Sequence, residues 1–76
     1  MDHVELNSSN RSIETRVRNA FEKLGYPQLM KIEIHHASGV LTLQGSLQSF
    51  YLTQIAQTVA IKIEGVKRVI NQLKVE

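Results

Sequence analysis

The sequence has no cysteine and no tryptophan, and its 76 residues include only one proline. The absence of cysteine excludes a disulfide framework and thiol chemistry, and leaves the redox compartment open. No apolar run approaches the roughly 20 residues that a transmembrane helix needs. The first ten residues lack the basic and apolar regions of a secretory signal. We therefore expect a cytoplasmic location for the chain as written, or a periplasmic or membrane-peripheral one if it is part of a longer precursor.

The chain has only a small excess of positive charge. Nine Lys and Arg residues against seven Asp and Glu residues give a formal net charge of +2. A dedicated nucleic-acid binder carries a stronger basic footprint. With 42% hydrophobic and 21% charged residues, the composition is that of one small globular domain.

Apolar periodicity predicts five elements. We expect a flexible tail over residues 1–10, which are polar and end in NSSN, and a single domain over residues 11–76. Helical spacing predicts a helix from Arg11 to Gly25 and a second one from Ser49, as N-cap, to Gly65. Period-two alternation predicts strands over residues 31–36, 40–44 and 69–75, the first two joined as a hairpin through residues 37–39.

This α-β-β-α-β order predicts an α+β fold. The strand, helix and strand after the hairpin form a crossover unit, so the second and third strands should be parallel. Each strand has one strongly apolar face. We therefore expect a two-layer sandwich, with a three-stranded mixed sheet and both helices on one face.

Gly45 occupies the next inward position after Leu41 and Leu43. We interpret it as allowing the second helix to approach the sheet, or as a bulge that redirects the chain. A merely permissive turn glycine is the alternative.

No catalytic or metal-binding pattern is present. His35 and His36 are adjacent in a strand and point to opposite faces, and His3 lies in the expected tail. Ser49 lacks the G-x-S-x-G context of a nucleophile and is better explained as a cap. We therefore predict a protein that is not an enzyme and uses no cofactor or metal.

Two surfaces are candidates for binding. The open sheet face should carry Lys31, Arg68 and Lys74, with His35 beside them and Glu33 as its one acid. It has no aromatic side chain for base stacking and the sequence has no GxxG clamp, which counts against RNA or DNA binding. On the first helix, Glu14, Arg18 and Glu22 are spaced four apart, so we expect local charge pairs there.

The second surface is the solvent side of the second helix, with Phe50, Tyr51, Gln54, Gln57 and Ile61. An exposed aromatic side chain at a helix start can insert into a lipid interface or a partner. Phe50 could instead fold over the hairpin edge as a small addition to the core.

The segments GVLTLQGSL, IAQTVAIKIEGV and VINQLKV together resemble the BON domain, a bacterial module named for osmotic-stress and nodulation proteins. The resemblance covers roughly residues 12–76. It implies an α-β-β-α-β module without catalytic residues, associated with phospholipid binding or with holding proteins at membranes. It also implies a structural signature, which comprises Gly45, Gly65, Val66, Val69, Asn71 and Leu73. We expect Asn71, which interrupts the inward apolar alternation, to be buried and to satisfy nearby backbone groups.

Two functional hypotheses follow. In the first, the chain binds anionic phospholipid through basic side chains, with Phe50 or Tyr51 as an apolar wedge. In the second, the helix surface or an exposed sheet edge binds a protein partner or, weakly, a second copy of the chain.

Overall fold

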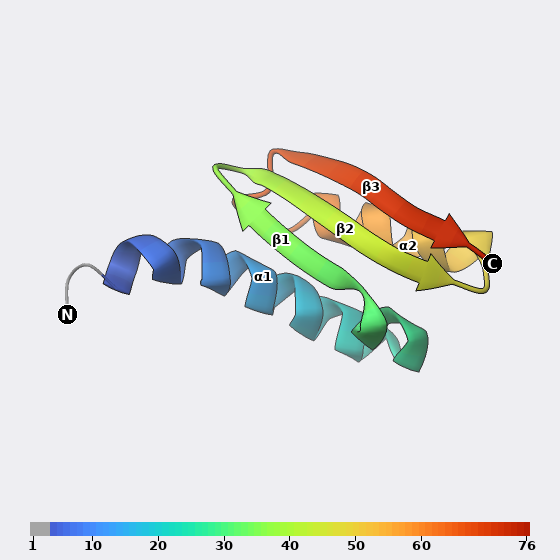
Figure 1. Cartoon of the computed structure of the whole chain (residues 1–76). Coiled ribbons are helices and arrows are strands. Elements are labelled where there is room, and N and C mark those ends of the chain that lie inside the picture. Colours follow the sequence, from blue (N-terminus) through green and yellow to red (C-terminus); the bar gives the residue numbers. More distant parts are fainter. Residues whose placement is uncertain (1–3) are drawn as a thin grey trace.

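The computed structural model describes the backbone of residues 4–76 and the side chains of residues 12–76. Its elements follow the predicted α-β-β-α-β order, with one additional 3₁₀ helix (Figure 1). They are α1 (Val4–Leu24), η1 (Pro27–Lys31), β1 (Glu33–Ala37), β2 (Val40–Leu47), α2 (Phe50–Ile61) and β3 (Arg68–Val75).

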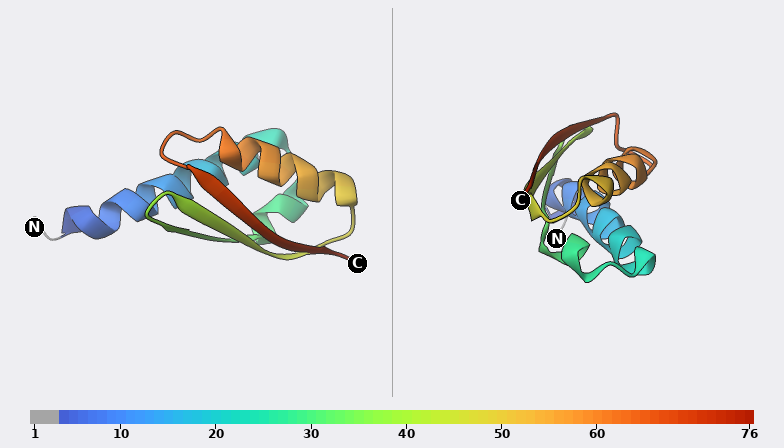
Figure 2. Two further views of the ribbon diagram at one scale, coloured as in Figure 1. Left: turned by 90° about the horizontal axis from the view of Figure 1, so that it is seen from above. Right: turned by 90° about the vertical axis from the view of Figure 1, so that its right-hand side faces the viewer.

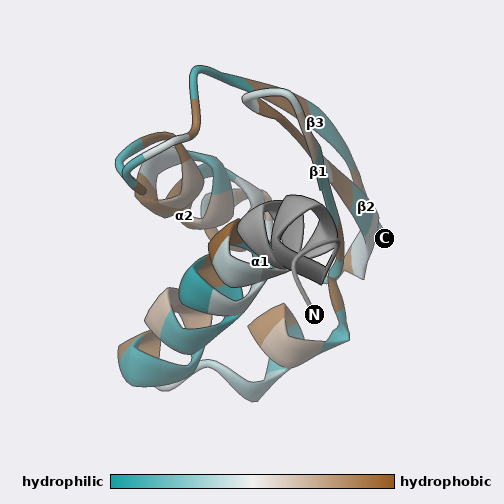
Figure 3. Ribbon diagram, turned by 90° about the vertical axis from the view of Figure 1, so that its left-hand side faces the viewer, coloured by the Kyte–Doolittle hydropathy of each residue, from teal (hydrophilic) through white to brown (hydrophobic). Residues whose placement is uncertain are grey.

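The sheet has the order β1-β2-β3, with β1 antiparallel and β3 parallel to β2. A two-residue turn, Ser38 and Gly39, joins β1 to β2, and both of its residues have positive φ. This is the conformation that matches the twist of a tight hairpin. Both helices lie on one face of the sheet (Figures 2 and 3). The predicted two-layer fold with a mixed sheet is confirmed.

The core lies between the sheet and the helices. Ile32 and the inward residues of β1 and β2 face α1, which contributes Val17 and Phe21, and α2, which contributes Leu52 and two alanines. The small side chains of Ala56 and Ala60 are fully buried, so the backbone of α2 can lie close to its neighbours. Leu29 of η1 closes the core and is also fully buried. The sequence pattern does not identify Leu29, because η1 is too short to show a period.

The first helix differs from the prediction at its start. It begins at Val4 rather than Arg11, and so runs through the segment predicted as a tail. Ser and Asn are only modest helix formers, but a polar run without Gly or Pro does not stop a helix. Residues 1–3 lie outside the described part of the chain.

Gly45 is a residue of β2, which continues through it to Leu47. Its φ of +143° is a conformation that other residues rarely adopt. A Cβ here would lie 3.7 Å from the Cα of Ile32 and 3.8 Å from a methyl group of Leu73, which are ordinary contacts. No atom of α2 is among its nearest neighbours, so the expected close approach of the helix is wrong. Backbone conformation, and not space, requires glycine at this position.

Candidate functional site

The two aromatic residues at the start of α2 are exposed. Ser49 caps this helix, and its Oγ accepts a hydrogen bond from the backbone N–H of Leu52 at 3.4 Å. Phe50 and Tyr51 follow directly, and each is 64% exposed. The alternative that Phe50 belongs to the core is therefore wrong.

More apolar side chains lie around Tyr51. It lines a hollow of about 500 Å³ between the helices, together with Leu24 and Tyr26. Tyr26 also borders a smaller hollow that Met30 helps to line. We call this surface the aromatic end and define it by Leu24, Tyr26, Met30, Phe50 and Tyr51, all partly or largely exposed.

Two lysines lie at the same end of the molecule. Lys31 is the last residue of η1, and Lys74 pairs in register with Ser46, near the end of β2. Beyond it, the backbone N–H of Glu76 donates to the carbonyl of Leu47, which holds the end of the chain close to the start of α2. Figure 1 shows η1, the start of α2 and the C-terminus together at this end. Lys31 and Lys74 therefore lie at the same end of the molecule as the aromatic end.

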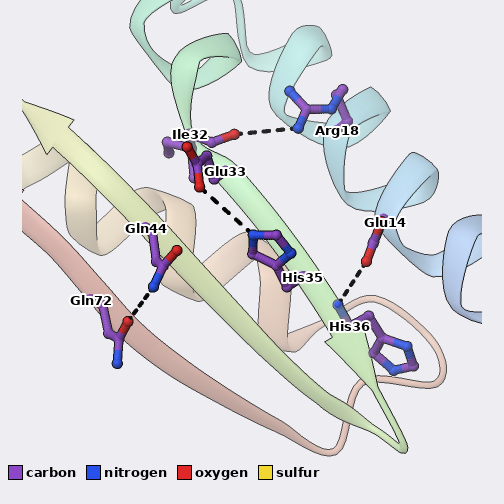
Figure 4. Close-up of polar contacts among 8 residues, drawn as sticks. All are labelled: Glu14, Arg18, Ile32, Glu33, His35, His36, Gln44 and Gln72. Carbon is purple, nitrogen blue, oxygen red and sulfur yellow. Dashed lines mark hydrogen bonds and ion pairs between the residues drawn. The ribbon is translucent and has the colours of Figure 1, made fainter.

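Arg68 lies elsewhere. It begins β3, six residues before Lys74, and a strand of that length spans about 20 Å. Between these two cations, Gln44 Nε2 donates to Gln72 Oε1 at 2.7 Å (Figure 4). The open sheet face therefore does not gather Lys31, Arg68 and Lys74 into one basic cluster. On the same face, His35 Nε2 lies 3.7 Å from a carboxylate oxygen of Glu33.

A second groove lies between α2 and the start of β3, with a volume of about 560 Å³. We call it the β3 groove. Its lining residues come from both elements and from the loop between them, and they are Gln54, Gln57, Thr58, Ile61, Lys67, Arg68 and Val69. Among the residues predicted for binding, Ile61, Gln54 and Arg68 therefore lie together, away from Phe50. Gln54 and Thr58 also line the hollow beside Tyr51, so the two hollows adjoin along α2.

Charged residues of α1 bind the edge of β1 rather than one another. Glu14 Oε2 accepts a hydrogen bond from the backbone N–H of His36 at 2.8 Å. The guanidinium of Arg18 donates to the backbone carbonyls of Met30 and Ile32, at 3.2 and 3.3 Å. Figure 4 shows the bonds to His36 and Ile32. The predicted local pairing of these side chains is therefore wrong, because the neighbouring backbone groups offer better placed partners.

Asn71 is exposed, contrary to the expectation that it is buried. Its amide does satisfy backbone groups, as expected: Oδ1 accepts from the N–H of Leu73 at 2.9 Å, and Nδ2 lies 3.5 Å from the carbonyl of Thr53. Nδ2 also donates to Oε1 of Gln57 at 3.0 Å. Asn71 thus connects β3 to α2.

The described side chains form no group of three metal-ligating residues. His35 is exposed and His36 is buried, where its Nε2 accepts a hydrogen bond from the N–H of Gly39. His3 lies outside the described residues. Over the described residues, no helix combines the length and the apolar character needed to cross a bilayer.

A protein-family model, that of the BON domain, matches residues 9–76. No curated protein matches the chain. The matched range contains every element of the sheet, α2 and most of α1. The chain therefore belongs to the BON domain family, as the resemblance of its second strand, second helix and last strand indicates.

Proposed function

We propose that the protein is a non-enzymatic binding module that associates with anionic phospholipid membranes through its aromatic end. The observation that carries this proposal is the 64% exposure of both Phe50 and Tyr51, adjacent to further exposed apolar side chains. An apolar cluster of this kind is costly to keep in water and gains free energy when it enters the boundary between headgroups and acyl chains. Membership of a family associated with phospholipid binding supports the same proposal.

Lys31 and Lys74, at the same end of the molecule as the aromatic end, supply the preference for anionic lipid. A cation near an anionic membrane contributes about 1 kcal/mol, and this contribution falls with salt because the interaction is screened. Lys31 and Lys74 are exposed, and their backbone lies at the same end of the molecule as the apolar side chains. The proposed orientation therefore places α2 with its N-terminus toward the membrane.

Vesicle flotation tests the proposal. We expect the wild-type chain to float with vesicles of phosphatidylglycerol and phosphatidylcholine at low salt. The double substitution Phe50→Ser and Tyr51→Ser should weaken this binding at least tenfold, which corresponds to about 1.4 kcal/mol. Both side chains are exposed, so the fold should persist.

Ile61→Ser is the matched control. Ile61 is a partly exposed apolar residue of the same helix, but it lies at the opposite end of α2, in the β3 groove. It should change vesicle binding less than twofold. Equal losses for the two variants, or no binding of the wild-type chain at low salt, would contradict the proposed site.

A further inference from the structure

The two edges of the sheet are protected to different extents. The outer edge of β1 is covered by α1, because Glu14 accepts the N–H of His36 and Arg18 donates to the carbonyl of Ile32. Among residues 4–76, no strand lies beyond β3, which is the other edge of the sheet. An uncovered strand edge is a template for an additional strand.

The backbone groups of β3 alternate in direction. The N–H groups of Arg68 and Glu76 donate to Gly39 and Leu47 on the side of β2, so the even-numbered residues face the sheet. The odd-numbered residues therefore direct their N–H and carbonyl groups outward. At Leu73 the outward N–H is already bound by the side chain of Asn71. Within residues 12–76, no side chain binds the N–H groups of Val69 and Asn71, so the first half of β3 is the uncovered part of the edge.

The β3 groove lies beside this uncovered half. Its described lining residues include two cations, Lys67 and Arg68, and no acidic side chain. The aliphatic part of Lys67 lies against Gly39, where a Cβ would meet its Cδ at 3.0 Å, and its backbone N–H donates to the carbonyl of Gly39 at 2.8 Å. The hairpin therefore positions this cation before any ligand arrives. Ile61 and Val69 add an apolar lining.

We propose that the first half of β3 binds an extended, acidic segment of a partner protein as a fourth strand. Backbone hydrogen bonds to Val69 and Asn71 would hold the segment, as in other strand additions. An acidic side chain of the segment lies at Lys67 and Arg68, and an apolar one lies against Ile61. Residues 67–76 contain three cations and one acid, so this edge favours an acidic partner over a second copy of itself.

Amide hydrogen exchange with a synthetic peptide tests the proposal. The probe is a capped peptide of alternating glutamate and valine, and its control has lysine in place of glutamate. We expect the acidic peptide to slow exchange at Val69 and Asn71 at least fivefold, while Ile70 and Gln72, which already bond to β2, change little. The lysine peptide should have no effect. Failure to slow exchange at the two outward amides would overturn the proposal.

Two charge-reversal variants test where an acidic side chain of the bound segment lies. Arg68→Glu should weaken binding of the acidic peptide about tenfold. Lys62→Glu, which also reverses the charge of an exposed residue but lies outside the groove, should alter this binding less than twofold. Equal effects of the two would contradict the assigned groove. If the same amides became protected without peptide as protein concentration rises, with a dimer in sedimentation, the occupant would be a second copy and the proposal would be wrong. None of these measurements involves lipid, so they can fail or succeed independently of the vesicle experiment.

Discussion

Gly45 and Gly65 both have positive φ, but their surroundings differ. A Cβ at Gly45 would meet only atoms at 3.7 Å or more, whereas a Cβ at Gly65 would lie 2.7 Å from Cδ1 of Ile13. Gly45 is thus required by the backbone alone. At Gly65, both the backbone conformation and the packing of Ile13 of α1 favour glycine.

Gly45→Ala should lower the free energy of unfolding by about 1–3 kcal/mol, the usual cost of a strained backbone conformation. Urea unfolding measures this, and Ser46→Ala, an exposed neighbour in the same strand, should stay within about 0.5 kcal/mol of wild type. Because strain and not crowding causes the loss, adding Leu73→Ala should not recover it. Recovery in the double variant would show that space matters at this position after all.

At the scale of elements, α1 does more than cover the core. Glu14 and Arg18, one helical turn apart, bind backbone groups along the outer edge of β1 and the end of η1. Figure 4 shows the bonds to His36 and Ile32. These bonds determine where α1 lies along β1, and they shield an edge that could otherwise pair with another chain. The helix therefore also contributes to keeping the sheet at three strands.

Glu14→Ala should lower the free energy of unfolding by about 1.5–3 kcal/mol, the range for a hydrogen bond to a charged group. Glu22→Ala removes the same charge from an exposed position of the same helix and should cost less than about 0.5 kcal/mol. Glu14→Gln keeps an acceptor oxygen and should fall between these values. Thermal or urea unfolding of the three variants provides the comparison. Equal stability of the Ala variants would mean that the bond to His36 contributes nothing.

At the scale of the whole molecule, the cations assigned to the two proposed binding functions lie at opposite ends of β3. Lys74 lies at the same end of the molecule as the aromatic end and Arg68 lines the β3 groove, and the strand between them spans about 20 Å. That distance exceeds the Debye length of roughly 8 Å at physiological salt, so each cation acts mainly on its own surface. One molecule could therefore contact a membrane and a protein segment at the same time.

Removing the charge of each cation in turn tests whether the two surfaces act independently. Lys74→Gln should weaken binding to phosphatidylglycerol vesicles about fivefold, since one cation near an anionic membrane contributes about 1 kcal/mol. It should leave binding of the acidic peptide unchanged. Arg68→Gln should weaken binding of the acidic peptide and leave vesicle binding unchanged. Vesicle flotation and peptide titration of both variants, each at low and at physiological salt, measure these effects. A matching loss of vesicle binding in both variants would instead indicate that the open sheet face meets the membrane.

The order and type of the two α-helices and the three strands could be predicted because each depends on local periodicity. Ile32 and Ile34 alternate with polar residues, and Leu52, Ala56 and Val59 recur at helical spacing, so the buried faces are evident without any long-range information. The family could be identified for the same reason, since its signature residues lie in these segments. The start of α1 could not be placed, because residues 4–10 have neither a strong stop signal nor an apolar stripe.

The two-layer arrangement follows from the amino-acid pattern, since single apolar faces on three strands and two helices leave few other ways to exclude water. Which side chains share a surface depends on the folded chain. The tertiary structure separates Arg68 from Lys74, places Tyr51 beside Leu24 and Tyr26, and joins Glu14 to His36. These contacts involve residues far apart in the chain, and the separation involves two residues close in it. A periodic pattern shows only which face of its element a residue occupies, not what lies opposite that face.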